Sequence, residues 1–170
     1  MSLIVGEFSE LKADYDGIPV QYFVQKKDVE HALRSFQKTP DMMRFFSEKI
    51  GVKYPYEKYS QTPIEDFMWG GMENISATTL TQATLHDARA HAGWDEDSEG
   101  LVAHELAHQW WGDLLTCRDW SHIWLNEGFA TFFDALRMEH DRGADEYKWK
   151  MRGSAGWYIG QSYSKPRPVV

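Results

Sequence analysis

The sequence contains a single cysteine, Cys117, among 170 residues. One cysteine excludes an intrachain disulfide, and it cannot by itself build a thiolate cage around a metal ion. No apolar run approaches the length that a membrane span needs. Internal repeats, low-complexity tracts and an interdomain linker are also missing. These absences leave one globular domain with its own core as the simplest interpretation.

Clusters of lysine and arginine are missing as well, and the formal net charge is −8. Because nucleic-acid binders carry basic patches, we expect no nucleic-acid partner. An acidic surface fits cationic ligands, but it is also common among proteins that bind none. The apolar fraction of 42% and the aromatic fraction of 15% are typical of a folded globular chain.

The hydrophobic pattern predicts an alternation of strands and helices. The expected elements are strands at 3–8 and 18–25 around a turn at Asp16 and Gly17, helices at 28–38 and 40–50, short strands and turns within 52–82, and helices at about 99–111, 123–140 and 144–152. Thr39 is expected to cap the second helix, with Pro40 at its first position.

The stretch "LVAHELAHQWWG", residues 101–112, places two histidines four residues apart on an expected helix. Residues at that spacing lie on one face, so His104 and His108 can both offer a nitrogen to one zinc ion. Glu105 lies about 100° around the helix. It is poorly placed to bind the same ion, but it can reach a water molecule beside it.

A plain helix with two incidental histidines is the alternative interpretation. The helix is apolar nearly all round, however, and buried histidines without partners are costly. A catalytic zinc ion usually has three protein ligands, and Glu127 is the candidate for the third. Eighteen residues separate it from His108, enough to end one helix and begin an antiparallel one. Its aromatic neighbours, among them Trp124 and Phe132, predict a deeply buried helix instead of a solvated glutamate.

Two motifs together resemble a known family. His104 to His108, followed by Glu127 in "NEGFA", resembles the zinc-ligand arrangement of the gluzincins. "GGMEN", residues 70–74, resembles the Gly-x-Met-Glu-Asn signature of the aminopeptidase-N family of zinc peptidases. "VGEF", "YPYEKY" and "CRDWSHIWLNEGFAT" are also similar to that family, so that the resemblance covers about residues 4 to 170.

The resemblance implies an α+β fold of the thermolysin-like zincin type, in which a small twisted sheet packs on helices. It also implies one zinc ion per chain and peptide substrates that have a free N-terminus. The implied roles are zinc ligands for His104, His108 and Glu127, general base for Glu105, contact with the substrate amine for Glu73, and backbone contact with the peptide for Gly70 and Gly71. Without the resemblance, Glu73 reads as an ordinary strand or turn residue.

The same resemblance implies a piece of a longer protein. Residues 1–16 would be a remnant of an upstream β domain and its connector, and 17–170 a catalytic domain truncated at its C-terminal end. The family's oxyanion-stabilising tyrosine would lie past Val170. Losing one oxyanion donor typically lowers turnover about 100- to 1000-fold, so we expect weak or no activity. Truncated edges that expose apolar surface would favour self-association.

Two other functions remain open on the sequence. One is a catalytically impaired or non-catalytic zinc-binding chain that acts as a scaffold, although all three ligands and the base are present. The other is an epoxide-hydrolysing relative with the same motifs. Metal content, cleavage of amino-acyl amides and loss of cleavage on acetylation of the substrate amine would separate these functions. The preferred terminal residue, the compartment and the oligomeric state are not readable.

Overall fold

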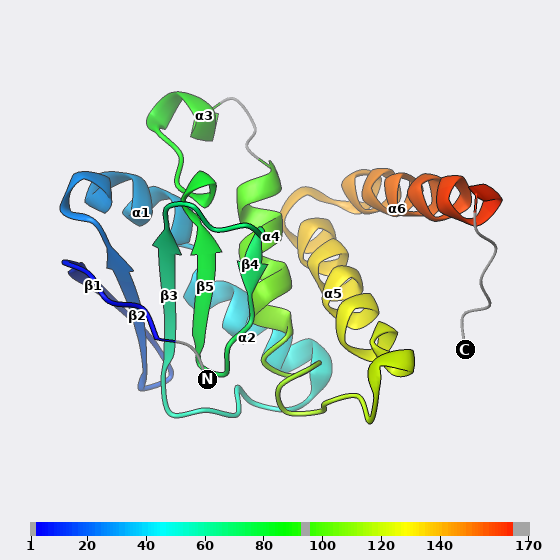
Figure 1. Ribbon diagram of the computed structural model, residues 1–170, viewed down its shortest axis with the longest axis horizontal. Coiled ribbons are helices and arrows are strands. Elements are labelled where there is room, and N and C mark those ends of the chain that lie inside the picture. Colours follow the sequence, from blue (N-terminus) through cyan, green and yellow to red (C-terminus); the bar gives the residue numbers. More distant parts are fainter. Residues whose placement is uncertain (1–2, 93–95, 165–170) are drawn as a thin grey trace.

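The computed structural model describes residues 3–92 and 96–164 (Figure 1). The strands are β1 (Ser9–Tyr15), β2 (Ile18–Val24), β3 (Tyr59–Ile64), β4 (Gly71–Met72) and β5 (Ala77–Thr81). The α-helices are α1 (Val29–Phe36), α2 (Thr39–Ile50), α3 (Ala88–Ala92), α4 (Glu96–Ala107), α5 (Trp124–Arg142) and α6 (Ala144–Ser164).

The five strands form one mixed sheet in the order β1-β2-β3-β5-β4. β1 and β2 are an antiparallel hairpin, and the backbone of Asp16 and Gly17 takes positive φ values of 51° and 83° in its turn, as predicted. The predicted strand at 3–8 is wrong, because the alternating segment that pairs with β2 is Ser9–Tyr15. β3 lies parallel to both β2 and β5, and short β4 runs antiparallel to β5 at the sheet edge.

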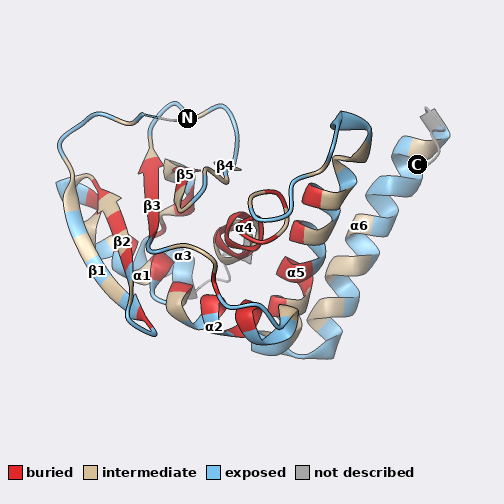
Figure 2. Ribbon diagram, turned by 90° about the horizontal axis from the view of Figure 1, so that it is seen from below, coloured by how far each residue is buried: buried red, intermediate tan, exposed pale blue. Residues whose placement is uncertain are grey.

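Helices α1, α2 and α4 lie on one side of the sheet, with α5 and α6 farther out beyond α4 (Figures 1 and 2). α4 therefore lies between the sheet and α5. Leu106 of α4 is buried, and so is Trp110 just after the helix, whose ring packs edge to face with the ring of Phe46 from α2. The predicted α+β class, with a small sheet packed on helices, is confirmed. This arrangement anchors α4 on two sides and leaves its remaining face for function.

Two helix starts and ends differ from the prediction. Thr39 is not the N-cap of α2: Lys38 holds that position, and the Thr39 hydroxyl donates to the Gln61 side-chain carbonyl at 2.9 Å. Because Gln61 is fully buried, its side chain needs hydrogen-bond partners inside the core, and the Thr39 hydroxyl is one of them. α6 is 21 residues long instead of ending near residue 152. Among the described residues, no helix is both long and apolar enough to cross a membrane.

Candidate functional site

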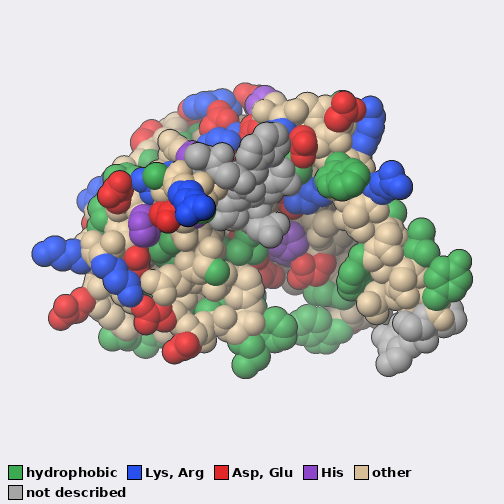
Figure 3. Space-filling model, turned by 90° about the horizontal axis from the view of Figure 1, so that it is seen from above, with side chains coloured by type: hydrophobic (Ala, Val, Ile, Leu, Met, Phe, Trp, Pro, Cys, Tyr) green, Lys and Arg blue, Asp and Glu red, His purple; other side chains and the backbone are tan. Residues whose placement is uncertain are grey.

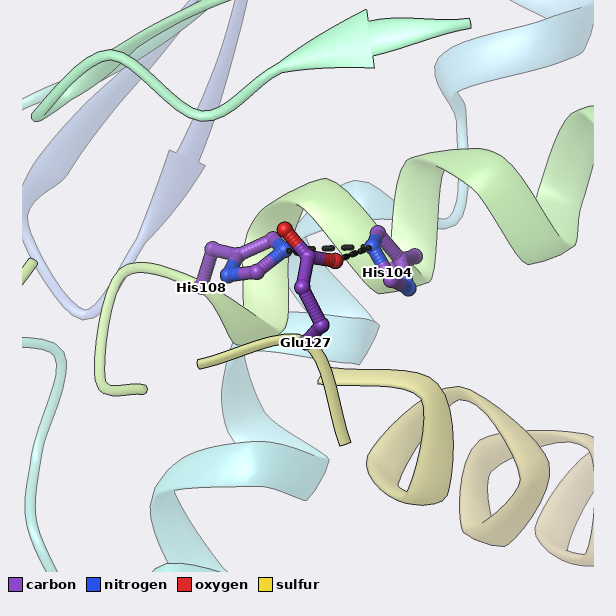
Figure 4. Close-up of side chains that lie close together, drawn as sticks. All are labelled: His104, His108 and Glu127. Atoms are coloured by element: carbon purple, nitrogen blue, oxygen red, sulfur yellow. Dashed lines mark hydrogen bonds and ion pairs between the residues drawn. The ribbon is translucent and has the colours of Figure 1, made fainter. Parts of the chain in front are cut away.

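The three predicted metal ligands meet at one point between α4 and α5 (Figure 4). The Nε2 atoms of His104 and His108 lie 3.1 Å apart. The Oε2 atom of Glu127 lies 3.3 Å from the first and 3.4 Å from the second. Figure 4 shows the three side chains pointing toward one another from the two helices.

This triangle fits a zinc ion. Zinc binds histidine nitrogen and carboxylate oxygen at about 2.0–2.1 Å, so the corners of a tetrahedral site lie about 3.3–3.4 Å apart. The three measured separations between His104, His108 and Glu127 fall at this spacing or slightly below it. Two neutral imidazoles and one carboxylate also leave a fourth position open, as catalytic zinc sites do.

The backbone fixes the orientation of His108. α4 ends at Ala107, yet the His108 N–H still donates to the His104 carbonyl at 3.2 Å, which keeps the two rings one helical turn apart. The Nδ1 atom of His108 lies 2.9 Å from the carbonyl oxygen of Trp111. If Nδ1 donates to that carbonyl, Nε2 keeps its lone pair for a metal ion.

Hydrogen bonds and charges link the three side chains and shift the pKa values of Glu127 and His108. Hydrogen bonds from His104 and His108 lower the pKa of Glu127 far below its usual range. Burial alone would lower the pKa of His108, but the hydrogen bond to Glu127, the charges of Glu73 and Glu127 and the contact with the Trp111 carbonyl together outweigh burial and raise this pKa to about 9. Near neutral pH a metal ion must therefore displace a proton from His108 before it binds.

Glu105 lies beside the ligands on the same helix but takes no part in the triangle. Its side chain is only 5% exposed, and its Oε2 atom has no hydrogen-bond partner. Burial raises the pKa of Glu105 to about 7. A carboxylate with a pKa near neutrality is well matched to accepting and returning a proton at that pH. A Cβ atom added to Gly71 would collide with this carboxyl group, so that Gly71 makes room for Glu105 beside β4.

A cleft of about 580 Å³ contains all the predicted site residues. Its walls come from β4 and the segment around it, from α4, and from α5 and α6. The lining residues are Trp69, Gly70, Gly71, Glu73, Gly100, Leu101, His104, Glu105, His108, Glu127, Asp134, Met138, Trp149 and Lys150. Figure 3 shows this hollow with acidic and histidine side chains inside it. The sequence motifs thus meet in one concave site, as expected for a ligand pocket.

Gln109, which follows His108, ties the Glu73 segment to α4. Its side chain is fully buried. The Gln109 amide nitrogen donates to the Glu73 carbonyl at 3.0 Å, and its oxygen accepts from the Ser76 N–H at 2.7 Å and from the Tyr54 hydroxyl at 3.4 Å. One side chain therefore sets the distance between the metal ligands and the predicted contact for the substrate amine.

Replacing Gln109 with alanine should lower the free energy of unfolding by about 2–3 kcal/mol, because three hydrogen bonds are lost and buried backbone groups remain unpaired. Urea denaturation measures this loss, and the exposed Gln37→Ala variant is the control. We also expect faster amide hydrogen exchange at Ser76. Unchanged stability together with unchanged exchange at Ser76 would contradict the proposed link.

A second group of potential ligands lies elsewhere on the surface: Asp41, His140 and Asp141. Arg137 already neutralises its two carboxylates, with an Nη2 atom 2.8 Å from each. The group therefore has a structural explanation as an ion-pair cluster that joins α2 to α5. It offers much weaker grounds for a metal ion than the site on α4.

His104, His108 and Glu127 lie together as the sequence reasoning expected, but their surroundings differ from the expectation. The expectation of a deeply buried α5 is wrong: Trp124 and Phe132 are 44% and 38% exposed, and the Glu127 side chain is 52% exposed because it faces the cleft. The prediction also missed Gln109, since a glutamine after the motif carries no local signal. The carboxylate of Asp134, which also lines the cleft, pairs with Lys150.

Sequence comparison relates the chain to known peptidases. Residues 34–162 match the peptidase family M1 domain. Aminopeptidase M1 of Arabidopsis thaliana is 38% identical over 145 residues, which are 82% of this chain and 16% of that protein. Aminopeptidase N of Streptomyces lividans is 33% identical over 140 residues, 79% of this chain and 16% of that protein. Glutamyl aminopeptidase of Homo sapiens is 33% identical over 151 residues, 87% of this chain and 15% of that protein.

The chain thus spans about a sixth of the length of these relatives. The family match nevertheless covers most of its residues, and the family predicted from the two motifs is confirmed. The chain belongs to the peptidase M1 family.

Proposed function

We propose that this chain is the zinc-binding catalytic part of an aminopeptidase that hydrolyses the N-terminal peptide bond of peptides. The observation that supports this proposal best is the convergence of His104, His108 and Glu127 at the spacing of a zinc site, with the buried carboxyl of Glu105 in the same cleft. The aminopeptidase names of the relatives agree with it.

In this proposal His104, His108 and Glu127 hold the ion. Bound zinc supplies Lewis-acid activation of the scissile carbonyl and lowers the pKa of the attacking water. Glu105 accepts a proton from that water and then donates it to the nitrogen of the leaving amine. The water oxygen forms a bond to the carbonyl carbon, the C–N bond to the next residue breaks, and the nitrogen leaves as an amine with the proton that Glu105 returns, while the terminal residue leaves with a new carboxylate.

Glu73 would restrict the reaction to chain ends. It lines the same cleft as Glu105 and His108, and its negative charge raises the pKa of both, which supports this proposal. A carboxylate at a fixed distance from the metal can pair with a terminal ammonium group, so that only the first peptide bond reaches the ion. The glycines Gly70 and Gly71 keep the approach to β4 free of bulky side chains.

To test this proposal, the zinc-loaded chain is incubated with a leucyl peptide for hours, and mass spectrometry measures the rate of cleavage. We expect cleavage that depends on the free amine and falls about 10²- to 10⁴-fold in Glu105→Gln. Acetylation of the peptide N-terminus should abolish it. The difference in affinity between L-leucinamide and the control N-acetyl-L-leucinamide measures recognition of the amine even where turnover is slow.

Equal cleavage of the free and acetylated peptides would contradict an aminopeptidase. Equal binding of the two amides would contradict the role of Glu73. A zinc-loaded chain that binds neither amide and cleaves neither peptide would favour the scaffold function instead, whereas hydrolysis of an epoxide substrate would favour the third function.

A further inference from the structure

The cleft has two chemically different ends. At one end Glu73 lies next to the C-terminal turn of α4, to which Gln109 ties it. At the other end, Gly70 lies against Leu101 and Lys150 against Gly100, beside an earlier turn of α4, and Trp69 and Trp149 line the same cleft. Gly100 precedes His104 by one helical turn, about 6 Å along the axis, on the side away from Glu73.

Lys150 is the one lysine or arginine among the described residues that line this cleft, and four carboxylates line it too: Glu73, Glu105, Glu127 and Asp134. Its side chain is 24% exposed, and its ammonium group is in contact with the carboxylate of Asp134, whose side chain is 8% exposed. A Cβ atom on Gly100 would lie 3.2 Å from the Lys150 Nζ atom. The glycine therefore lets the ammonium group reach between α4 and α5.

An ammonium group has three N–H donors, and Asp134 accepts from it on one side. Its cleft side can donate to a ligand. A peptide whose amine lies at Glu73 and whose backbone follows β4 sends its later residues toward Trp69 and Lys150. Since each extended residue spans about 3.3–3.6 Å, a group one or two residues beyond the cleaved bond can reach Lys150.

We propose that Lys150, held in place by Asp134, binds a carboxylate on the leaving side of the substrate. This inference rests on the proposed aminopeptidase function and assigns the cleft a preference for substrates with a negative charge one or two residues after the cleaved bond. The carboxylate can be the C-terminus of a di- or tripeptide or an acidic side chain. Lys150 is then a specificity-determining residue and Asp134 a positioning residue.

A purely structural ion pair that fastens α6 to α5 is the competing explanation. It would affect stability, but it would not distinguish a carboxylate from an amide in the ligand. A test therefore compares ligands that differ only in that group, and its first arm needs no variant.

In the first arm, tryptophan fluorescence measures the affinity of the zinc-loaded chain for L-leucyl-glycine and for L-leucyl-glycinamide within the first minute. Chromatography checks that the peptide is still intact. L-Leucyl-L-aspartamide and L-leucyl-L-asparaginamide, both C-terminal amides, test the side-chain source. We expect about 10-fold tighter binding of the carboxylate in at least one pair, as for a charge-assisted hydrogen bond. No preference in either pair would overturn the proposal.

In the second arm, Lys150→Met should abolish the preference, and Lys150→Arg should retain it. Lys148→Met is the matched control, since Lys148 lies on the same helix, is 72% exposed and pairs with Asp145. Equal loss of affinity for both members of each pair in Lys150→Met would overturn the proposal in favour of a structural role. N-Acetyl-L-leucyl-glycine separates the two claims: if it binds as tightly as the free peptide, the aminopeptidase proposal fails.

Discussion

Replacing Glu127 with alanine is expected to strip zinc from the chain. The wild-type chain should retain about one zinc ion after extensive dialysis, and the variant well below that. Loss of one of three ligands should lower zinc affinity by more than the 10- to 100-fold typical of changes outside the ligand set. Because the Glu127 side chain is 52% exposed, the fold should survive the substitution. Elemental analysis and competition with a zinc-binding dye measure the two quantities.

Glu139→Ala is the matched control, because Glu139 lies on the same helix outside the cleft. An Asp141→Ala variant tests the second group of potential ligands, and we expect its zinc content to equal that of the wild type. Retention of a full zinc equivalent by Glu127→Ala would show that the ligand set is wrong. A folded wild-type chain that binds no zinc would show that these three residues do not suffice.

The metal-free Glu105→Gln variant is expected to be more stable than the wild-type chain at alkaline pH, by up to about 3 kcal/mol. Burial raises the pKa of Glu105 from its ordinary value of 4.5 to about 7. The folded chain therefore binds this proton more tightly than the unfolded chain does. Ionisation of Glu105 costs no stability below pH 4.5, an increasing amount between pH 4.5 and 7, and a constant amount above pH 7.

Urea denaturation with a chelator present, at pH 5 and at pH 8, measures this difference. The gain of the variant should be large at pH 8 and small at pH 5, while the exposed Glu48→Gln variant should show no such change. A gain of equal size at both values would mean that the ionised carboxyl is not the source. A larger gain at pH 8 than at pH 5 would fit a site in which a residue needed for the chemistry lowers the stability of the fold.

The proximity of the three predicted ligands could be read from the sequence because the information about it is local. His104 and His108 are four positions apart, and a helix turns that spacing into a shared face. Glu127 follows on the next helix, and a chain of eighteen residues leaves few ways to place α5 other than beside α4. The same reasoning gave the hairpin turn at Asp16 and Gly17, since two positive φ values favour such residues there.

The partners of these residues were not readable, because they depend on contacts between distant segments. Gln109 meets the Glu73 carbonyl across 36 positions, and Thr39 turns inward to Gln61 across 22. Nothing in the sequence near Gln109 or Thr39 distinguishes these side chains from surface ones. The underestimated length of α6 has another cause: Gly153, Gly156 and Gly160 weaken helix propensity, yet α6 continues through them to Ser164 although most residues after Arg152 are exposed.

The ligand set on two successive helices also bears on the order of events as the chain folds. Bringing His108 and Glu127 together closes a loop of eighteen residues, which costs about 3 kcal/mol in chain entropy beyond a constant. Bound zinc in structural sites contributes about 10 kcal/mol or more. If zinc binds these residues, we expect it to join α4 to α5 before the distant strands pair, whereas Glu73 takes its place when β4 pairs with β5. The metal-binding part of the site would then form first, and the part that recognises the substrate N-terminus would form last.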